Sequence, residues 1–296
     1  MKALVRSFAF AAAFAGPAVA VEIEPSIQYW MSEGKTTWNH NAQRANPAFG
    51  NPTSQLTYSG MKSGIAELGL AVRIGEWFGA GTFGSGSIDG GTLRDEDWLA
   101  GQVKFSDTNS VIKGDEIRYW MLDVGRNVFR NRKFAVAALG GFGKYQEVID
   151  AYGATNNLAG GAVLAPASTR VITNDATWTF FRMGAAGRFR PWEPLTLSAE
   201  LAYLPVVDLS SEDSHYLRGD LGPVPNIHMS GTGDGHMWQL EARYNVFKGA
   251  ILSLAYRDWR FRADGTIRFG ASGQSLPLNN FETTRSGARL GFSYRF

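Results

Sequence analysis

The chain has 296 residues, a formal net charge of +2, 35 glycines, 13% aromatic residues and no cysteine. The near balance of 29 basic and 27 acidic residues argues against a nucleic-acid partner, which would require a basic surface. The lack of cysteine excludes disulfide cross-links, a thiol nucleophile and thiolate metal sites.

The first twenty residues have the features of a secretory signal peptide. Lys2 and Arg6 supply positive charge, residues 8–15 are apolar, and Ala18 and Ala20 are the small residues that a signal peptidase reads. The apolar run is too short to span a membrane, and no later run reaches the ~20 residues that a spanning helix needs. We therefore expect residues 1–20 to be cleaved and residues 21–296 to form one domain with about equal numbers of positive and negative charges.

Ten segments after the signal peptide have the features of β-strands, because apolar and polar residues alternate between turn signals. Four of the nine connections are tight, whereas five are long and polar. Short periplasmic turns and long external loops are typical of bacterial outer-membrane barrels. The predicted strands lie at residues 22–33, 55–73, 77–92, 111–128, 133–150, 174–190, 195–212, 236–247, 250–264 and 281–296.

The last strand shows two faces clearly. Leu290, Phe292, Tyr294 and Phe296 alternate with polar residues and glycine. A barrel strand that faces lipid needs this pattern of apolar residues outside and polar residues inside. The sequence therefore predicts an all-β fold, a ten-stranded antiparallel transmembrane β-barrel of the bacterial outer membrane.

Two short motifs each place a pair of ionisable side chains on one face of a strand. Asp95 and Asp97 follow the third predicted strand, and Asp213 and His215 follow the seventh. Side chains at positions i and i+2 of a strand point the same way. If the N-terminus is periplasmic, both pairs lie at the extracellular rim on opposite walls. Facing each other there, they would form a site that activates water.

Strict alternation along the seventh strand would turn its motif away from the interior. Counted from Tyr203, both Asp213 and His215 would fall on the lipid-facing side. Pro205 cannot donate a hydrogen bond to the ladder and is typical of a bulge. We therefore predict a register break between Tyr203 and Leu209 that turns both motif residues inward.

The two motifs together resemble those of the omptins, a family of ten-stranded outer-membrane endopeptidases. The active site in that family pairs an Asp-x-Asp, usually followed by Trp, with an Asp-x-His. Asp95-Glu96-Asp97-Trp98 and Asp213-Ser214-His215-Tyr216 match both strings, and weaker likeness covers most of the mature chain. The resemblance implies an aspartate-histidine endopeptidase that cleaves polypeptides at the extracellular rim without a metal or other cofactor. We also expect a monomer.

In the mechanism that this resemblance implies, His215 is the general base, since neutral imidazole titrates near 6.5 in model compounds. Asp213 fixes its tautomer and stabilises the imidazolium. Asp95 and Asp97 hold the attacking water, and two close carboxylates titrate as a coupled pair.

The chain departs from the family at the expected substrate pocket. Omptins that cleave between basic residues have an acidic pocket, and Trp38 and Ser211 stand at the corresponding positions here, with Glu212 nearby. Selectivity for a basic side chain needs a buried countercharge. We therefore expect a specificity that is not strictly dibasic.

The family also binds lipopolysaccharide through a basic and aromatic cluster on the outside of the barrel. Tyr145, Glu147 and Arg190 match that cluster, whereas Ile149 stands where an arginine is usual. The resemblance implies contact with outer-membrane lipid, weaker binding of lipopolysaccharide, and lipopolysaccharide as a potential requirement for activity.

Two other functions stay open at this stage. A non-enzymatic barrel of the same architecture would serve as an adhesin or a small pore, although ten strands enclose too little space for a wide channel. An enzyme that modifies lipid A would need an apolar slot for an acyl chain, and the inward arginines of the sixth predicted strand argue against such a slot.

Overall fold

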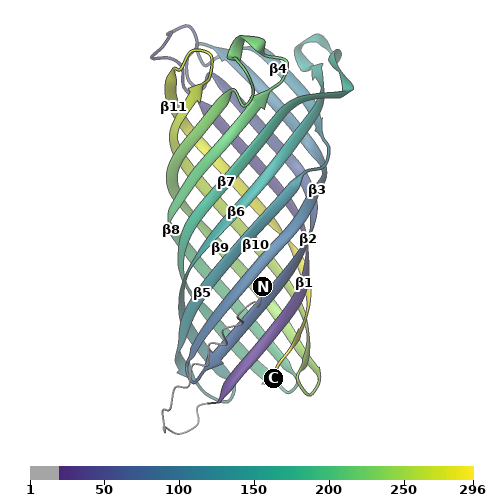
Figure 1. Ribbon diagram of the computed structural model, residues 1–296, viewed down its shortest axis with the longest axis vertical. Helices are drawn as coiled ribbons and strands as arrows, with labels where there is room; N and C mark the ends of the chain where they lie inside the picture. The colour runs from purple at the N-terminus through teal and green to yellow at the C-terminus, as the bar shows by residue number, and fades with distance from the viewer. Residues whose placement is uncertain (1–19) are drawn as a thin grey trace, which may run out of the picture.

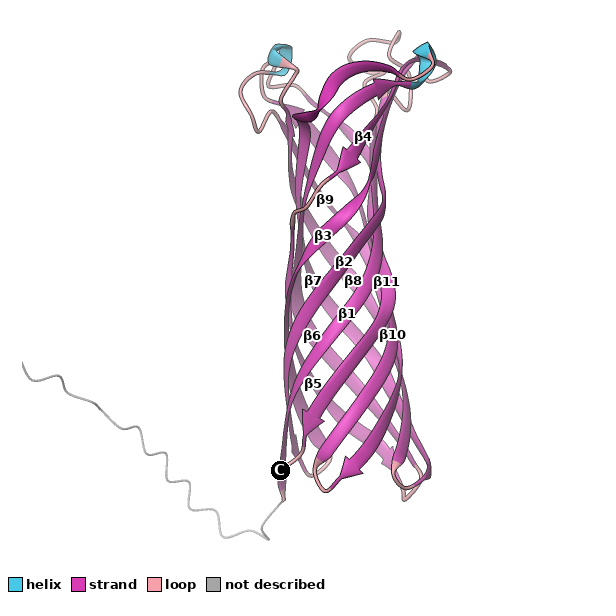
Figure 2. Ribbon diagram, turned by 90° about the vertical axis from the view of Figure 1, so that its right-hand side faces the viewer, coloured by secondary structure: helices cyan, strands magenta, loops and turns pink. Residues whose placement is uncertain are grey.

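The computed structural model describes residues 20–296, which form a closed antiparallel β-barrel (Figure 1). The predicted signal peptide lies outside the described residues, apart from Ala20. Figure 2 shows the long loops gathered at one end, here called the loop end, and the tight turns at the other, the turn end. No helix among residues 20–296 is long and apolar enough to cross a membrane.

Eleven strands build the barrel, and they form a ring of ten staves because β4 and β5 are successive parts of one stave. Both pair with β3 on one side and with β6 on the other, and β1 closes the ring by pairing with β11. The ten-stranded antiparallel barrel is therefore confirmed. The strands are β1 (Val21–His40), β2 (Ser54–Ile74), β3 (Trp77–Leu99), β4 (Val103–Ile112), β5 (Glu116–Arg130), β6 (Phe134–Asn156), β7 (Ala162–Trp192), β8 (Leu195–His215), β9 (Ile227–Phe247), β10 (Ala250–Phe269) and β11 (Ser275–Tyr294).

An apolar belt surrounds the lower part of the barrel and ends well short of the loop end. On β8 the outward residues up to Val206 are apolar, whereas Asp208, Ser210 and Glu212 beyond it are polar and exposed. His215 lies nine positions after Val206 in the sequence. At about 3.3 Å per residue and a tilt of about 45°, the end of β8 stands on the order of 20 Å beyond the belt.

The turn end carries a girdle of exposed aromatic side chains. Such girdles mark the membrane–water interface of outer-membrane barrels, so the turn end lies at one face of the bilayer. The girdle consists of Trp77, Phe129, Phe134, Trp192, Phe247 and Phe296.

The middle of the barrel is filled by side chains. Trp30, Tyr119 and Trp259 pack edge to face at centroid distances of 4.9 to 6.3 Å. Below them the fully buried Glu67 pairs with Arg257 and with the neighbouring Arg289 at 3.5 Å. The charges on the polar inner faces that the sequence predicts are thus neutralised by ion pairs. The packed aromatic layer fills the middle of the barrel and argues against the small-pore alternative.

Candidate active site

A bulge in β8 sets the face on which its motif lies. The pairing of β8 with β9 shifts between Leu204 and Val207, and the pairing with β7 shifts at the same level. Below the bulge Tyr203 faces outward, whereas above it Val207 and Asp213 are fully buried. The predicted register break is confirmed, and it turns Asp213 and His215 toward the interior.

His215 ends β8 and is held by two neighbours. Its Nε2 lies 3.4 Å from Oδ2 of Asp213, whose side chain is fully buried. Its backbone N–H donates to Oδ1 of Asn226 at 2.9 Å, and Nδ2 of Asn226 donates back to the His215 carbonyl at 3.1 Å. The amide of Asn226 therefore fixes the backbone that carries the imidazole.

Asp95 and Asp97 lie within β3, which continues to Leu99, rather than in a loop after it. The outer face of the strand is polar at this level, so the apolar signal ends before the ladder does. Asp97 pairs in register with Ser54 of β2 and Ser106 of β4. Burial raises the pKa of Asp97, and hydrogen bonds from these two hydroxyls oppose part of that rise.

Charges from the two walls act on one another at this end of the barrel. Burial and then the neighbouring Asp97 raise the pKa of Asp95, while His215 opposes the shift, and the net pKa is about 7. Burial lowers the pKa of His215, but the carboxylates of Asp213 and Asp95 outweigh this, so that the net pKa lies above 6.5. Tyr58, fully buried on β2, has a pKa raised by burial and by both Asp213 and Asp95.

These mutual effects place the two motifs in one electrostatic environment, although their strands stand on different walls. In the strand order, three staves separate β3 from β8 on one side and five on the other. The site contains Asp95, whose pKa is raised to about 7, a second carboxyl group, Asp97, whose pKa is also raised, and an imidazole with a carboxylate partner. Such an arrangement can bind a water molecule and accept a proton from it.

An ion-paired cluster holds the upper part of β3. Arg94 donates to both oxygens of Asp107 on β4, at 3.0 and 2.7 Å, and Lys104 contacts both Asp107 and Glu96. Hydrogen bonds from Arg94 hold the pKa of Asp107 well below its usual range. Glu96 lies between Asp95 and Asp97 in the sequence but faces this cluster, so it braces the hairpin that carries them.

Sequence reasoning missed two residues that act on the site. Asn226 positions His215, and nothing in the Gly- and Pro-rich loop before it distinguished this residue. Arg218 follows the Asp-x-His motif by three residues, and its charge lowers the pKa of both Asp95 and Asp97. A lone basic residue beside the motif was the available signal for Arg218.

The predicted substrate-binding residues divide between the two faces of the wall. Trp38 and Ser211 are buried on the inner face, and Nδ2 of Asn174 donates to the Ser211 hydroxyl at 3.2 Å. Glu212 instead lies on the outer face, more than half exposed, with His228 Nδ1 at 3.7 Å. Its placement in the pocket is wrong, because alternation along β8 turns it away from its neighbours Ser211 and Asp213.

The predicted lipopolysaccharide cluster does not form. Tyr145 and Glu147 are fully buried inside the barrel, where the Tyr145 hydroxyl donates to Glu147 at 2.8 Å and Arg285 lies 3.4 Å from the same carboxylate. Arg190 is at the turn end, 3.6 Å from Glu193. The prediction is wrong because the inner face of β6 carries the odd-numbered residues at this level, and a shift of one residue exchanges the faces.

Within residues 20–296 no group of three or more His, Cys, Asp or Glu side chains has a geometry that could hold a metal ion.

Fold and site together define an outer-membrane β-barrel with a candidate hydrolytic centre at one end. A family model described as the omptin family matches residues 46–253, which is more than half of the chain. The chain therefore belongs to the omptin family of outer-membrane proteases.

One of the matching solved structures shares the fold of this chain over nearly all of its length. The outer membrane protease OmpT from Escherichia coli superposes with a TM-score of 0.77 at 15% identity, covering 93% of this chain and 97% of that one. The translocator domain of the autotransporter NalP from Neisseria meningitidis gives a TM-score of 0.42 at 14% identity, covering 95% and 90%. No curated protein matches the chain.

Proposed function

We propose that this omptin is an endopeptidase in which Asp95, Asp97, Asp213 and His215 together activate water for peptide-bond hydrolysis. The observation that carries the proposal is geometric: the bulge in β8 turns Asp213 and His215 inward, 3.4 Å apart, at the same end of the barrel as Asp95 and Asp97 of β3. The pKa shifts that Asp95 and His215 cause in each other agree with it. Isolated acidic loops and solvated histidines would not interact in this way. Family membership supports proteolysis as the reaction.

In the proposed reaction, a water held by Asp95 and Asp97 attacks the carbonyl carbon of the scissile bond as its proton passes to His215. Nε2 of His215 faces Asp213, so a neutral imidazole that donates from Nε2 keeps Nδ1 as the acceptor. Asp213 stabilises the imidazolium that forms. The same proton then passes to the amine as the C–N bond breaks, which leaves a carboxylic acid and a free amine.

The site would face the outside of the cell. The first strand, β1, begins at the turn end, and the last strand, β11, finishes there. Outer-membrane barrels place their short turns in the periplasm. The candidate site lies at the opposite end, beyond the apolar belt, where extracellular polypeptides can reach it.

Specificity in this proposal is not strictly dibasic. Trp38 and Ser211 are buried on the inner face of the barrel, Ser211 two residues before Asp213 on β8, and neither supplies a carboxylate to pair with a basic side chain. Desolvating an arginine guanidinium without such a partner is unfavourable. The indole of Trp38 favours an aromatic or aliphatic substrate side chain, or a cation held by weak stacking.

The test is cleavage of a mixed peptide library by refolded protein, with cut sites determined by mass spectrometry, in the presence and absence of lipopolysaccharide. His215→Ala and Asp95→Ala should each lower the rate by about 10²–10⁴. Matched controls are His236→Ala and Asp89→Ala, which remove the same groups from exposed or half-buried positions elsewhere on the barrel. Heat-modifiable gel mobility verifies that each variant folds.

Three results would count against the proposal. Equal rates for parent and both site variants would mean that the motif is not the catalytic site. No cleavage by the parent with or without lipopolysaccharide would favour a non-enzymatic barrel. A sharp preference for Lys or Arg on both sides of the cut would refute the specificity argument alone.

A further inference from the structure

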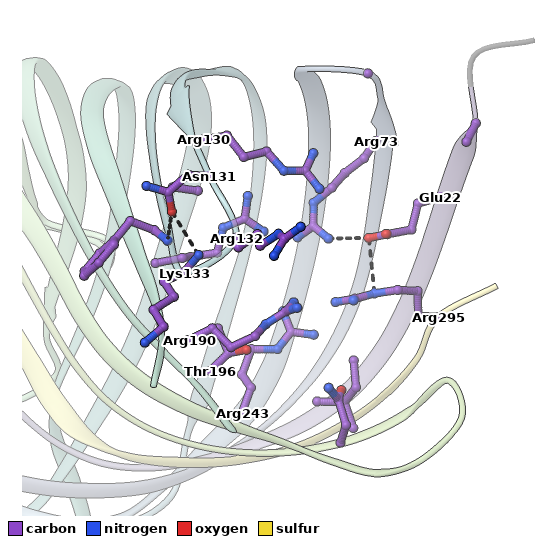
Figure 3. Close-up of a pocket in the computed structure, with 17 residues that line it drawn as sticks. Glu22, Arg73, Arg130, Asn131, Arg132, Lys133, Arg190, Thr196, Arg243 and Arg295 are labelled. Carbon is purple, nitrogen blue, oxygen red and sulfur yellow. Dashed lines mark hydrogen bonds and ion pairs between the residues drawn. The ribbon is translucent and has the colours of Figure 1, made fainter. Parts of the chain in front are cut away.

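The turn end of the barrel opens into a cavity of about 440 Å³ whose walls are strongly cationic (Figure 3). Eight arginine and lysine side chains line it, and Glu22 is the one lining carboxylate among the described residues. Its volume falls in the range of about 300–1,000 Å³ that is typical of small-ligand sites. The candidate active site lies at the other end, beyond the packed aromatic layer.

Half of these cations have carboxylate partners. Arg73 pairs with Glu22, Arg243 pairs with Glu24, and Arg295 contacts both of these carboxylates, at 3.2 and 2.9 Å. A fourth cation, at the edge of the cavity, lies 3.6 Å from an exposed glutamate. Three carboxylates therefore serve four of the eight cations.

The other half have no acidic partner within 4 Å among residues 20–296. They are Arg130, Arg132, Lys133 and Arg188, contributed by β5, β7 and the turn after β5. Arg188 donates to the neutral amide oxygen of Asn127 at 3.1 Å. Eight positive charges against three negative charges leave an excess of five in one cavity, and arginine does not relieve such repulsion by losing its proton.

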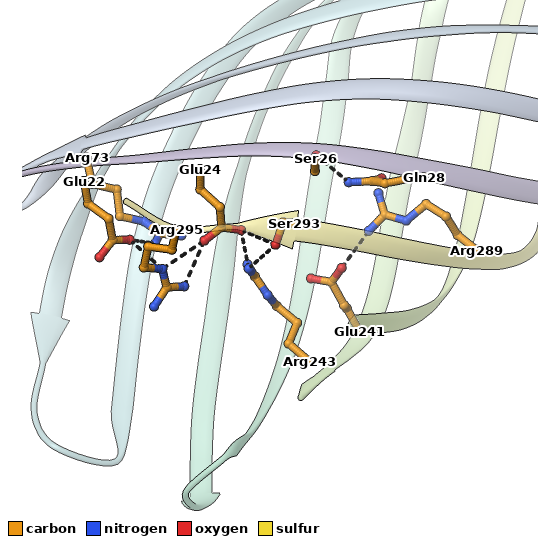
Figure 4. Close-up of polar contacts among 10 residues, drawn as sticks. All are labelled: Glu22, Glu24, Ser26, Gln28, Arg73, Glu241, Arg243, Arg289, Ser293 and Arg295. Carbon is orange, nitrogen blue, oxygen red and sulfur yellow. Dashed lines mark hydrogen bonds and ion pairs between the residues drawn. The ribbon is translucent and has the colours of Figure 1, made fainter. Parts of the chain in front are cut away.

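The adjacent layer of the lumen shows that this excess is local. There Arg289 donates to Glu241 at 2.8 Å, and Ser293 donates to Glu24 at 3.0 Å (Figure 4). A small cavity of about 150 Å³ in this layer has both carboxylates and arginines in its lining. The chain thus supplies countercharges deeper in the barrel but leaves them out at the mouth, where a ligand can enter.

From this contrast we propose that the turn-end cavity binds an anion that carries more than one phosphate group. Planar guanidinium groups match phosphate oxygens with paired hydrogen bonds, and an excess of five charges favours a polyanion over a single carboxylate. The phosphate groups can belong to a soluble ligand or to headgroups of the surrounding lipid, since the aromatic girdle places the cavity at the level of the bilayer surface.

The test is isothermal titration calorimetry, in which tripolyphosphate is titrated into the refolded full chain in neutral detergent. Arg130→Gln/Arg132→Gln removes two exposed, unpaired guanidinium groups and should weaken binding by about tenfold or more for each group. The control Lys35→Gln/Lys62→Gln makes the same change in net charge on the exposed outer wall and should leave affinity within about twofold. Heat-modifiable mobility verifies folding of both variants.

Repeating the titration in phosphatidylcholine bilayers with and without phosphatidylglycerol distinguishes the sources of phosphate. Competition by phosphatidylglycerol in the parent, lost in the Arg130/Arg132 variant, would assign the cavity to lipid headgroups. Unchanged affinity in both bilayers would assign it to a soluble ligand. No binding of tripolyphosphate in detergent, or equal affinity in the Arg130/Arg132 variant and its control, would overturn the proposal.

Discussion

Replacing Asp95 with asparagine should stabilise the folded chain at alkaline pH while removing peptidase activity. The reason is that the ionised carboxylate is held in an unfavourable place, partly withdrawn from solvent and close to Asp97. Its pKa is raised from 3.8 to about 7 in the folded chain. The folded chain therefore binds this proton more tightly than the unfolded chain does, and stability falls as pH rises from about 4 to about 7.

The size of the effect follows from the shift. About three pKa units, at about 1.4 kcal/mol each, set a ceiling of about 4 kcal/mol above pH ~7. Asp95 is only partly withdrawn from solvent, and water screens some of this repulsion. We therefore expect Asp95→Asn to raise the free energy of unfolding by about 2–3 kcal/mol at about pH 8 and by much less at about pH 4.

The assay is urea unfolding of refolded protein in detergent, followed by tryptophan fluorescence, for parent and variant at both pH values. Asp89→Asn is the matched control, because Asp89 is exposed on the same strand and should show no pH-dependent gain. An equal gain for Asp95→Asn at both pH values, or a loss of stability at about pH 8, would refute the reasoning.

Three further predictions concern proton transfer, the bulge and the interior. The pH profile of kcat/KM should fall on the acid side with an inflection above about 6.5, and Asp213→Asn should move that inflection lower, because burial then acts on His215 without its carboxylate partner. An inflection that does not move would exclude His215 as the base. Deleting Val206 should remove the one extra residue of the bulge and leave Asp213 and His215 facing inward, because both then fall at odd spacings from the outward Tyr203 in an unbroken ladder, so the variant should still cleave; loss of cleavage in a barrel that folds would show that the bulge does more than set the face. Glu67→Leu should lower the free energy of unfolding by about 3–5 kcal/mol, because it leaves Arg257 buried without a carboxylate and Arg289 with Glu241 alone, whereas Glu282→Gln in an exposed pair should change it by less than about 1 kcal/mol, as urea titration would show.

Strand periodicity was enough to predict the barrel, because each stave inside the membrane has one apolar and one polar face. It was also enough to locate the bulge, since Pro205 lies where the alternation fails. The ends of the strands near the loop end were not predicted, because the prediction depended on this contrast between an apolar and a polar face. Above the belt both faces are polar, so the pattern that marks a strand in lipid is lost although the hydrogen-bonded ladder continues to Leu99 and His215.

The site residues were predicted unevenly, and the errors concern faces and long-range contacts. Asp213 was placed correctly because its parity was argued from its own strand. Tyr145 and Glu147 were placed by resemblance alone, without counting alternation along β6, and were assigned to the wrong face. Asn226 could not be found, because its role depends on a loop that folds back over the end of β8.

The central claim is that the carboxylate pair and the aspartate-histidine pair act as one unit, and a double-variant cycle of peptide cleavage tests it most directly. We predict that Asp95→Asn and His215→Ala each lower kcat by about 10²–10⁴, and that the double variant is about as slow as the slower single variant. If the two losses multiply in the double variant, the claim is contradicted. Two groups that act on the same water should not have independent effects on kcat, because removing either one already disables that water.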